Sequence, residues 1–174
     1  MFEAHYSGRP RPAERPRARF SYDSRSYYIY NPPEYQKYKA VLREFFNQYE
    51  DDAALQELFD PQEIVYGLSV KLIFKLKSKG SKPFYGKRPD IDNLFKAVTD
   101  SLFESNVNQI RNGDEQDKEG NLITDEEGNP IPKYKQKIDD SRIIHSEMLK
   151  LRVDHEEEEG ITIILRNVGK EDIQ

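Results

Sequence analysis

A two-residue alternation of apolar side chains over residues 68–76 constrains the fold more than any other feature of the sequence. The apolar positions are Leu68, Val70, Leu72, Phe74 and Leu76, and the positions between them include Ser69, Lys71 and Lys75. Successive residues of a strand point to opposite faces, so this pattern predicts a strand with one well-buried face. Such a strand needs neighbouring strands and a layer of helices to bury that face.

Two segments with helical periodicity can supply that layer. Residues 34–49 carry apolar side chains at a spacing of 3.6, after a helix-opening Pro32-Pro33 pair. These side chains are Tyr35, Tyr38, Val41, Leu42, Phe45, Phe46 and Tyr49. A second helix is predicted from Ile91, with Leu94, Phe95, Val98 and Leu102 on its apolar face. A short helical piece is predicted within 51–59.

Further strands are indicated on both sides of these helices. Aromatic runs at 20–22 and 27–30 flank a turn at Asp23-Ser24 and predict a hairpin. Alternation over 143–151 and the apolar run 161–167 predict two more strands, with His145 expected to be a buried, hydrogen-bonded histidine. The expected fold is α+β, one domain over residues 1–174, with a small mixed β-sheet and helices packed on it.

Composition excludes several classes of protein. The chain has 174 residues and no cysteine, so disulfide frameworks and thiolate metal sites are excluded. No apolar run approaches the length of a membrane span, and a cytoplasmic protein without a membrane partner is expected. The net charge of −5 is uneven, because residues 1–100 hold 17 Lys and Arg against 14 Asp and Glu while 101–174 hold 10 against 18. Basic patches in the first part remain available to a polyanion.

The start of the second predicted helix concentrates charge. Asp90 and Asp92 stand two residues apart, after Lys87-Arg88 and before Lys96. One interpretation is structural: an Asp caps the helix, and Asp92 pairs with Lys96 one turn on, which contributes a few tenths of a kcal/mol. The other interpretation is chemical, because Asp139-Asp140 precedes a strand that we expect to lie near this helix start. A set of carboxylates without His or Cys suits Mg²⁺ or Mn²⁺ and phosphodiester hydrolysis.

Other schemes lack their parts. The three histidines have no metal-binding spacing, and no phosphate-binding G-x-x-x-x-G-K-[ST] loop or G-x-S-x-G motif occurs. Residues 107–137 show no sustained period and predict a hairpin insertion that is poor in apolar residues. Within it Glu115, Asp117, Glu119, Gly120 and Glu126 fall at the spacing of a calcium loop, although the first position is not Asp and flanking helices are absent.

The motif "RPDIDNLFKAVTDSLFES", followed later by "DDSRI" and a strand, resembles the RusA family of Holliday junction resolvases of bacteria and their phages. The resemblance rests on Asp90, Asp92, Asn93 and Lys96, then Asp139-Asp140, and on the Arg- and Pro-rich segment that leads into the first helix. The long insertion between the two acidic motifs departs from the family pattern.

This resemblance implies a homodimeric endodeoxyribonuclease that uses Mg²⁺, with Mn²⁺ as a substitute, to make paired nicks in four-way DNA during recombination and repair. Asp90, Asp92 and Asp140 would bind metal, with Asp139 as a further ligand, and Lys96 would face the phosphate as a catalytic cation. Residues expected to bind DNA are Arg15, Arg17, Arg19, Lys82, Lys87 and Arg88.

Three alternatives remain open at this point. The chain could be a non-catalytic nucleic-acid-binding module, whose affinity for DNA would survive loss of Asp90 and Asp92. It could be a related nuclease for flaps or forks. It could be an interaction protein whose acidic hairpin binds a basic partner.

Overall fold

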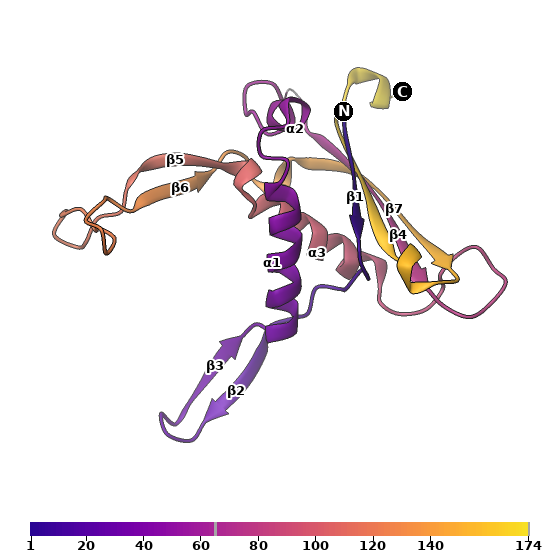
Figure 1. Ribbon diagram of the computed structural model, residues 1–174, viewed down its shortest axis with the longest axis horizontal. Coiled ribbons are helices and arrows are strands. Elements are labelled where there is room, and N and C mark those ends of the chain that lie inside the picture. The colour runs from indigo at the N-terminus through magenta and orange to yellow at the C-terminus, as the bar shows by residue number, and fades with distance from the viewer. Residues whose placement is uncertain (65, 174) are drawn as a thin grey trace.

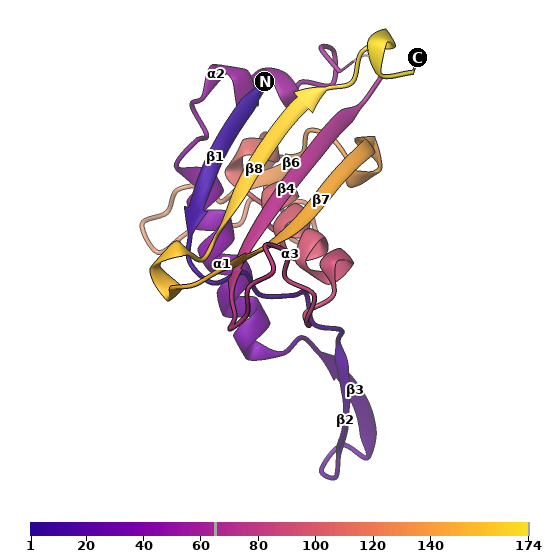
Figure 2. The ribbon, with the colours of Figure 1, turned by 90° about the vertical axis from the view of Figure 1, so that its right-hand side faces the viewer.

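A four-stranded mixed sheet organises the computed structural model, which describes residues 1–64 and 66–173. Figure 2 shows the strands in the order β1-β8-β4-β7. Their bounds are β1 Phe2–Ser7, β4 Leu68–Lys77, β7 Ile143–Val153 and β8 Gly160–Asn167. β8 pairs antiparallel with both β1 and β4, whereas β7 runs parallel to β4. The predicted α+β fold with a mixed sheet is confirmed.

The three α-helices of the described residues lie on one side of this sheet (Figures 1 and 2). They are α1 Pro33–Asn47, α2 Ala53–Leu58 and α3 Ile91–Phe103. Leu42 and Phe46 of α1 meet Leu72 and Phe74 of β4 in a core from which water is excluded. Each such side chain contributes roughly 1.5–3 kcal/mol on burial, so the stripes seen in the sequence fix which helix faces turn inward.

The parallel pairing of β4 with β7 determines where α3 points. Because β7 runs parallel to β4, the chain must return from the end of β4 to the level of its first residue before β7 can begin beside it. Leu68 and Ile143, the first residues of the two strands, pair with one another. α3 makes this return, so it begins near the end of β4 and finishes near the start of β7.

The first strand was not expected from the sequence. Phe2 and Ala4 of β1 are buried against the helices, while Glu3 and His5 point to the opposite face of the sheet. His145 lies on that same uncovered face, because it pairs with Ser69 in the register of β4 and β7. Its Nδ1 is hydrogen-bonded to the Ser69 hydroxyl at 2.8 Å. The prediction of a buried His145 is therefore wrong, although the predicted hydrogen bond of its ring is present.

Two hairpins extend from the body at opposite ends of α3 (Figure 1). The predicted first hairpin is formed by β2 Arg17–Ser21 and β3 Ser26–Tyr30. The insertion forms a second hairpin, from β5 Gln109–Asp114 and β6 Pro132–Gln136. Short 3₁₀ turns occur at Asn106–Asn108, Asp140–Arg142, Glu156–Glu158 and Lys170–Ile173. None of the helices in the described ranges has the length and apolar character needed to cross a membrane.

Candidate functional site

Two aspartates at the start of α3 have free carboxylates. Asp90 occupies the N-cap position but makes no side-chain hydrogen bond to the helix, and Asp92 follows in the first turn. Both are exposed, and neither side chain has a hydrogen-bond or ion-pair partner within residues 1–64 and 66–173. Asp52 shows what a capping aspartate does here, because its Oδ1 accepts the Leu55 N–H of α2 at 2.9 Å. The structural explanation of the paired aspartates therefore fails, and both remain available to a ligand.

Lys96 also departs from the simple pairing expected from the sequence. Its Nζ contacts Asp100 Oδ1 at 2.9 Å, one turn further along α3, instead of Asp92. Asp100 also accepts a hydrogen bond from the Tyr35 hydroxyl at 3.3 Å. Burial, together with the Asp100 carboxylate, raises the pKa of Tyr35, so this hydroxyl stays protonated and keeps donating. Asp100 thus positions the Lys96 side chain along α3, the helix that begins at the paired aspartates.

A cleft of about 610 Å³ opens beside Asp90 and joins it to the N-terminal segment. Its cationic lining consists of Arg9, Arg11 and Arg88. The Ala13 N–H donates to the Asn93 carbonyl at 2.8 Å and so fastens the segment to the first turn of α3. Free carboxylates beside three guanidinium groups form a site that can hold a cation and a phosphate together.

Arg9 and Arg11 were not among the predicted DNA-binding residues, although they belong to the same Arg- and Pro-rich run. Among the described residues each forms one long ion pair, Arg9 with Glu159 at 3.5 Å and Arg11 with Glu34 at 3.9 Å. The spacing of the prolines in this run could have predicted them, because prolines keep the segment extended until it reaches α3.

The six predicted DNA-binding residues are all exposed, in two groups. Arg15, Arg17 and Arg19 lie on or just before β2, and Lys82, Lys87 and Arg88 lie in the loop between β4 and α3. This loop is tied to β7 by two backbone hydrogen bonds. Tyr85 donates to Lys150 O at 3.0 Å and Arg152 donates to Pro83 O at 2.8 Å. Tyr85 is buried, whereas the neighbouring Phe84 is exposed.

Asp139 and Asp140 lie at the other end of α3. The Asn108 side chain donates to Phe103 O, on the last residue of α3, and to Ile138 O, at 3.0 and 2.9 Å. In contrast, the start of α3 is held near the end of β7, where Lys150 Nζ donates to the carbonyls of Lys87 and Pro89 at 2.7 and 2.8 Å. A helix of 13 residues is about 20 Å long, since each residue adds 1.5 Å.

A single chain therefore does not bring Asp140 to Asp90 and Asp92, contrary to the expectation from sequence. The reason is the parallel pairing of β4 and β7. It puts the start of β7 beside the start of β4, where α3 ends, and not beside the start of α3. Across the described ranges, no three Asp, Glu or His side chains are grouped closely enough to hold a metal ion. Asp139 itself accepts the Ser141 N–H at 2.9 Å, and the Ser141 side chain and this backbone donor lower the pKa of its carboxyl.

The acidic end of the insertion is built from two similar turns. Asp117 Oδ1 accepts the backbone N–H groups of Glu119 and Asn121, both at 2.9 Å. Asp125 repeats this pattern eight residues later with Glu127 and Asn129. The Asn121 side chain lowers the pKa of Asp117 most, and the backbone N–H of Asn129 lowers the pKa of Asp125 most. The calcium-loop interpretation is not supported, because no three acidic side chains of the described residues lie close enough together to hold a metal ion.

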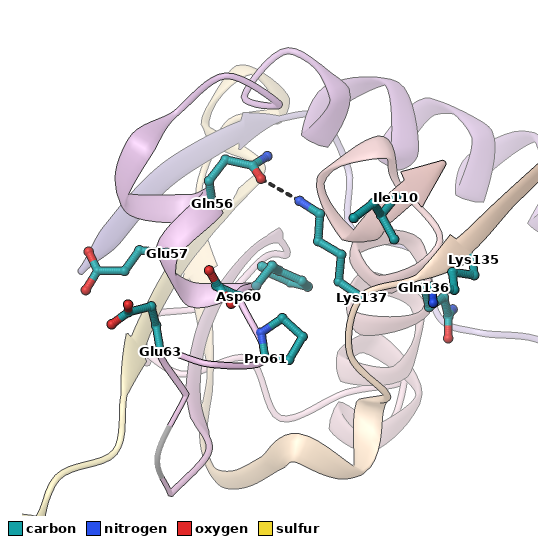
Figure 3. Close-up of a pocket in the computed structure, with 10 residues that line it drawn as sticks. Gln56, Glu57, Asp60, Pro61, Glu63, Ile110, Lys135, Gln136 and Lys137 are labelled. Carbon is teal, nitrogen blue, oxygen red and sulfur yellow. Dashed lines mark hydrogen bonds between the residues drawn. The ribbon is translucent and has the colours of Figure 1, made fainter. Parts of the chain in front are cut away.

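The root of the insertion is part of the body of the protein. Ile110 and Lys137 line a cavity of about 830 Å³ (Figure 3). Its opposite wall is formed by Gln56, Glu57, Phe59, Asp60, Pro61 and Glu63. Lys137 Nζ donates to Gln56 Oε1 across the cavity, and burial lowers the pKa of this lysine despite the nearby Asp60 carboxylate. Val107 and Asn108, which precede β5, are also buried. The hairpin therefore has a buried root and an exposed end.

This division predicts two different outcomes for shortening the hairpin. Replacing residues 113–131 by a two-residue turn should keep the fold, because nearly all of them are exposed and the Arg111–Tyr134 pairing remains. We expect an unfolding temperature within a few degrees of that of the full chain, measured by circular dichroism. Removing 107–137 should instead unfold the protein, because it deletes Val107 and the Asn108 clamp. Loss of folding in the shorter deletion would show that the acidic end supports the core.

Comparison with known proteins places this site in a family. The sequence profile of a family described as "Endodeoxyribonuclease RusA" matches residues 7–116. This range contains the Arg- and Pro-rich segment, both free aspartates and Lys96, and it ends before Asp139. Searches of curated proteins and of solved structures gave no match. With more than half of its residues matched, the chain belongs to the RusA family of endodeoxyribonucleases, hydrolases that act on Holliday junction DNA.

Proposed function

We propose that the protein is a Mg²⁺-dependent, homodimeric resolvase that cuts four-way DNA by paired nicks in recombination and repair. The observation that carries this proposal is a pair of aspartates at the start of α3 whose carboxylates do not cap the helix, next to a cleft lined by arginines. Carboxylate oxygens are the ligands that Mg²⁺ prefers, and guanidinium groups bind the phosphates of a strand. Mn²⁺ would be accepted by the same oxygens.

Each metal site would be completed by a second copy of the chain. Asp90 and Asp92 lie at one end of α3 and Asp140 lies at the other, too far apart to share one ion. A two-fold axis that sets α3 antiparallel to α3 of the partner reverses these ends. Asp140 of one protomer would then meet Asp90 and Asp92 of the other, and two equal sites would form. This arrangement reconciles the predicted ligand set with the fold.

The surface beside α3 is suited to such an interface. Met148 of β7 pairs with the buried Leu72 and so points to the helical side of the sheet, but it is 37% exposed. It lies on the strand next to α3, on which Ile91 and Phe95 are only partly buried. β7 is also the last strand of the sheet in the order found among the described residues. An apolar patch at this edge is the kind of surface that dimers bury.

The chain's own groups have separable roles in this proposal. Bound Mg²⁺ would supply an activated water and would neutralise charge on the scissile phosphate. Asp90, Asp92 and Asp140 would hold the ion, with Asp139 beside them. Lys96 would leave Asp100 to contact a phosphate oxygen, and Arg9, Arg11 and Arg88 would position the strand that is cut.

The remaining cations would hold the arms of the junction. Arg15, Arg17 and Arg19 extend from the cleft along the first hairpin, and Lys82 and Lys87 lie in the loop that leads into α3. Contacts of this kind bind phosphates without reading sequence, and they weaken as salt rises.

Labelled four-way junction, flap and plain duplex, each incubated with Mg²⁺ or with EDTA, test this function. We expect cleavage of the junction with Mg²⁺ at symmetric positions on two opposing strands, and no cleavage in EDTA. Binding should persist in EDTA, because it depends on cations of the protein. Preferential cleavage of flaps would replace the junction by another branched substrate, and binding without any cleavage would favour a non-catalytic module.

A further inference from the structure

The first hairpin is an arm that the core does not cover. β2 and β3 pair only with each other in the described part of the chain, and they extend beyond the start of α1 (Figures 1 and 2). An isolated two-stranded hairpin is marginally stable in water. Its side chains therefore gain from a partner outside the body of the chain.

The register of the arm separates its side chains into two faces. Arg17 pairs with Tyr30 and Arg19 with Tyr28, and directly opposed residues share a face. The alternating pairs Ala18–Ile29 and Phe20–Tyr27 form the other face, which we call the aromatic face together with Tyr22. Phe20 contacts the rings of Tyr22 and Tyr27 edge-on, with centroids 5.2 and 5.1 Å apart. The aromatic face has no charged group.

This face is open to water to an unusual degree. Tyr22, Ile29 and Tyr27 are 86%, 77% and 76% exposed, and Phe20 is 37% exposed. Since a large aromatic side chain offers roughly 150–250 Å² of surface, the patch amounts to several hundred Å². Contiguous exposed apolar surface of that size marks an interaction site on a soluble protein.

We propose that the aromatic face stacks on unpaired bases at the branch point of the DNA, an inference that rests on the proposed function. Charge favours DNA as the occupant, because residues 15–30 contain four arginines and a single Asp23. Position favours it as well, since the segment that enters the arm is fastened to the first turn of α3 by the Ala13–Asn93 hydrogen bond. The arm thus begins at the cleft next to the paired aspartates.

The two faces of the arm would contact different parts of the DNA, one the phosphates and the other the bases. Arg17 and Arg19 meet the backbone of any DNA, whereas the aromatic face needs bases that are not already stacked inside a duplex. Such bases occur where helical arms meet. Stacking on an aromatic side chain accounts for about 5- to 150-fold in affinity per base. The arm would therefore make the enzyme selective for branched DNA.

The double variant Phe20→Leu/Tyr27→Leu tests this role, because leucine keeps the face apolar but cannot stack. Binding in EDTA should weaken by about tenfold or more for a four-way junction and stay unchanged for a duplex. The matched control, Arg17→Gln/Arg19→Gln, should weaken binding to both and reduce the salt dependence. A 2-aminopurine base at the branch point should change its fluorescence with the natural chain and not with the leucine variant.

Equal junction affinity for the natural chain and the leucine variant would overturn the stacking role. So would a lower mass of the leucine variant in light scattering, which would show that the face binds a second copy of the chain. A natural chain that neither prefers nor cuts a junction would instead overturn the proposed function. These results are distinguishable, because the first two leave cleavage by the natural chain intact.

Discussion

Asp92→Asn should abolish cleavage of a four-way junction while leaving the affinity for that junction the same or higher. The Asp92 carboxylate is exposed and forms no hydrogen bond or ion pair among the described residues, so the fold should survive the loss of its charge. Asparagine keeps the shape of the side chain but removes a charge that the metal requires. Since even indirect support of a metal ligand contributes 10- to 100-fold, we expect at least a hundredfold loss of rate.

Affinity should follow the opposite trend, because one negative charge is removed from a site that meets phosphate. Cleavage is measured with Mg²⁺ on a labelled junction, and binding is measured in EDTA. Asp51→Asn is a suitable control, since Asp51 is an exposed aspartate in the turn between α1 and α2. Parallel loss of binding and cleavage in Asp92→Asn would indicate a folding defect, and unchanged cleavage would remove Asp92 from the metal site.

Local patterns in the sequence predicted the main elements of this fold. The alternation over 68–76 and the helical stripe over 34–49 correspond to β4 and α1, because both segments bury one face against the same core. β1 was missed although Phe2, Ala4 and Tyr6 alternate with polar residues, since the segment is short and has no continuous apolar run. The face occupied by His145 could not be judged, because sequence does not show which side of a sheet stays uncovered.

The candidate site was only partly accessible to sequence reasoning. The motif identified Asp90, Asp92 and Lys96 as neighbours, because they lie within two turns of one helix. The distance from Asp92 to Asp140 depends on the direction of β7 relative to β4, and nothing in either strand encodes that direction. The contribution of Arg9 and Arg11 depends likewise on a hydrogen bond between segments 80 residues apart in the chain, Ala13 and Asn93.

Asp92→Asn and Asp140→Asn chains should each be inactive alone, but a heterodimer of the two should cleave DNA. If every site takes Asp90 and Asp92 from one protomer and Asp140 from the other, a heterodimer of Asp92→Asn and Asp140→Asn chains contains one doubly altered site and one natural site. It should nick a single strand of the junction, at about half the rate per dimer of the natural protein. Chains with different affinity tags, expressed together, allow this heterodimer to be purified.

The measurement that tests the shared site most directly compares this heterodimer with a second one, made of a natural chain and an Asp92→Asn/Asp140→Asn chain. Both heterodimers contain the same two substitutions and differ only in how they are distributed. The shared site predicts nicking by the first and none by the second, because in the second each site loses one aspartate. Nicking by the second heterodimer, with none by the first, would show that each chain holds a complete site and would contradict the account.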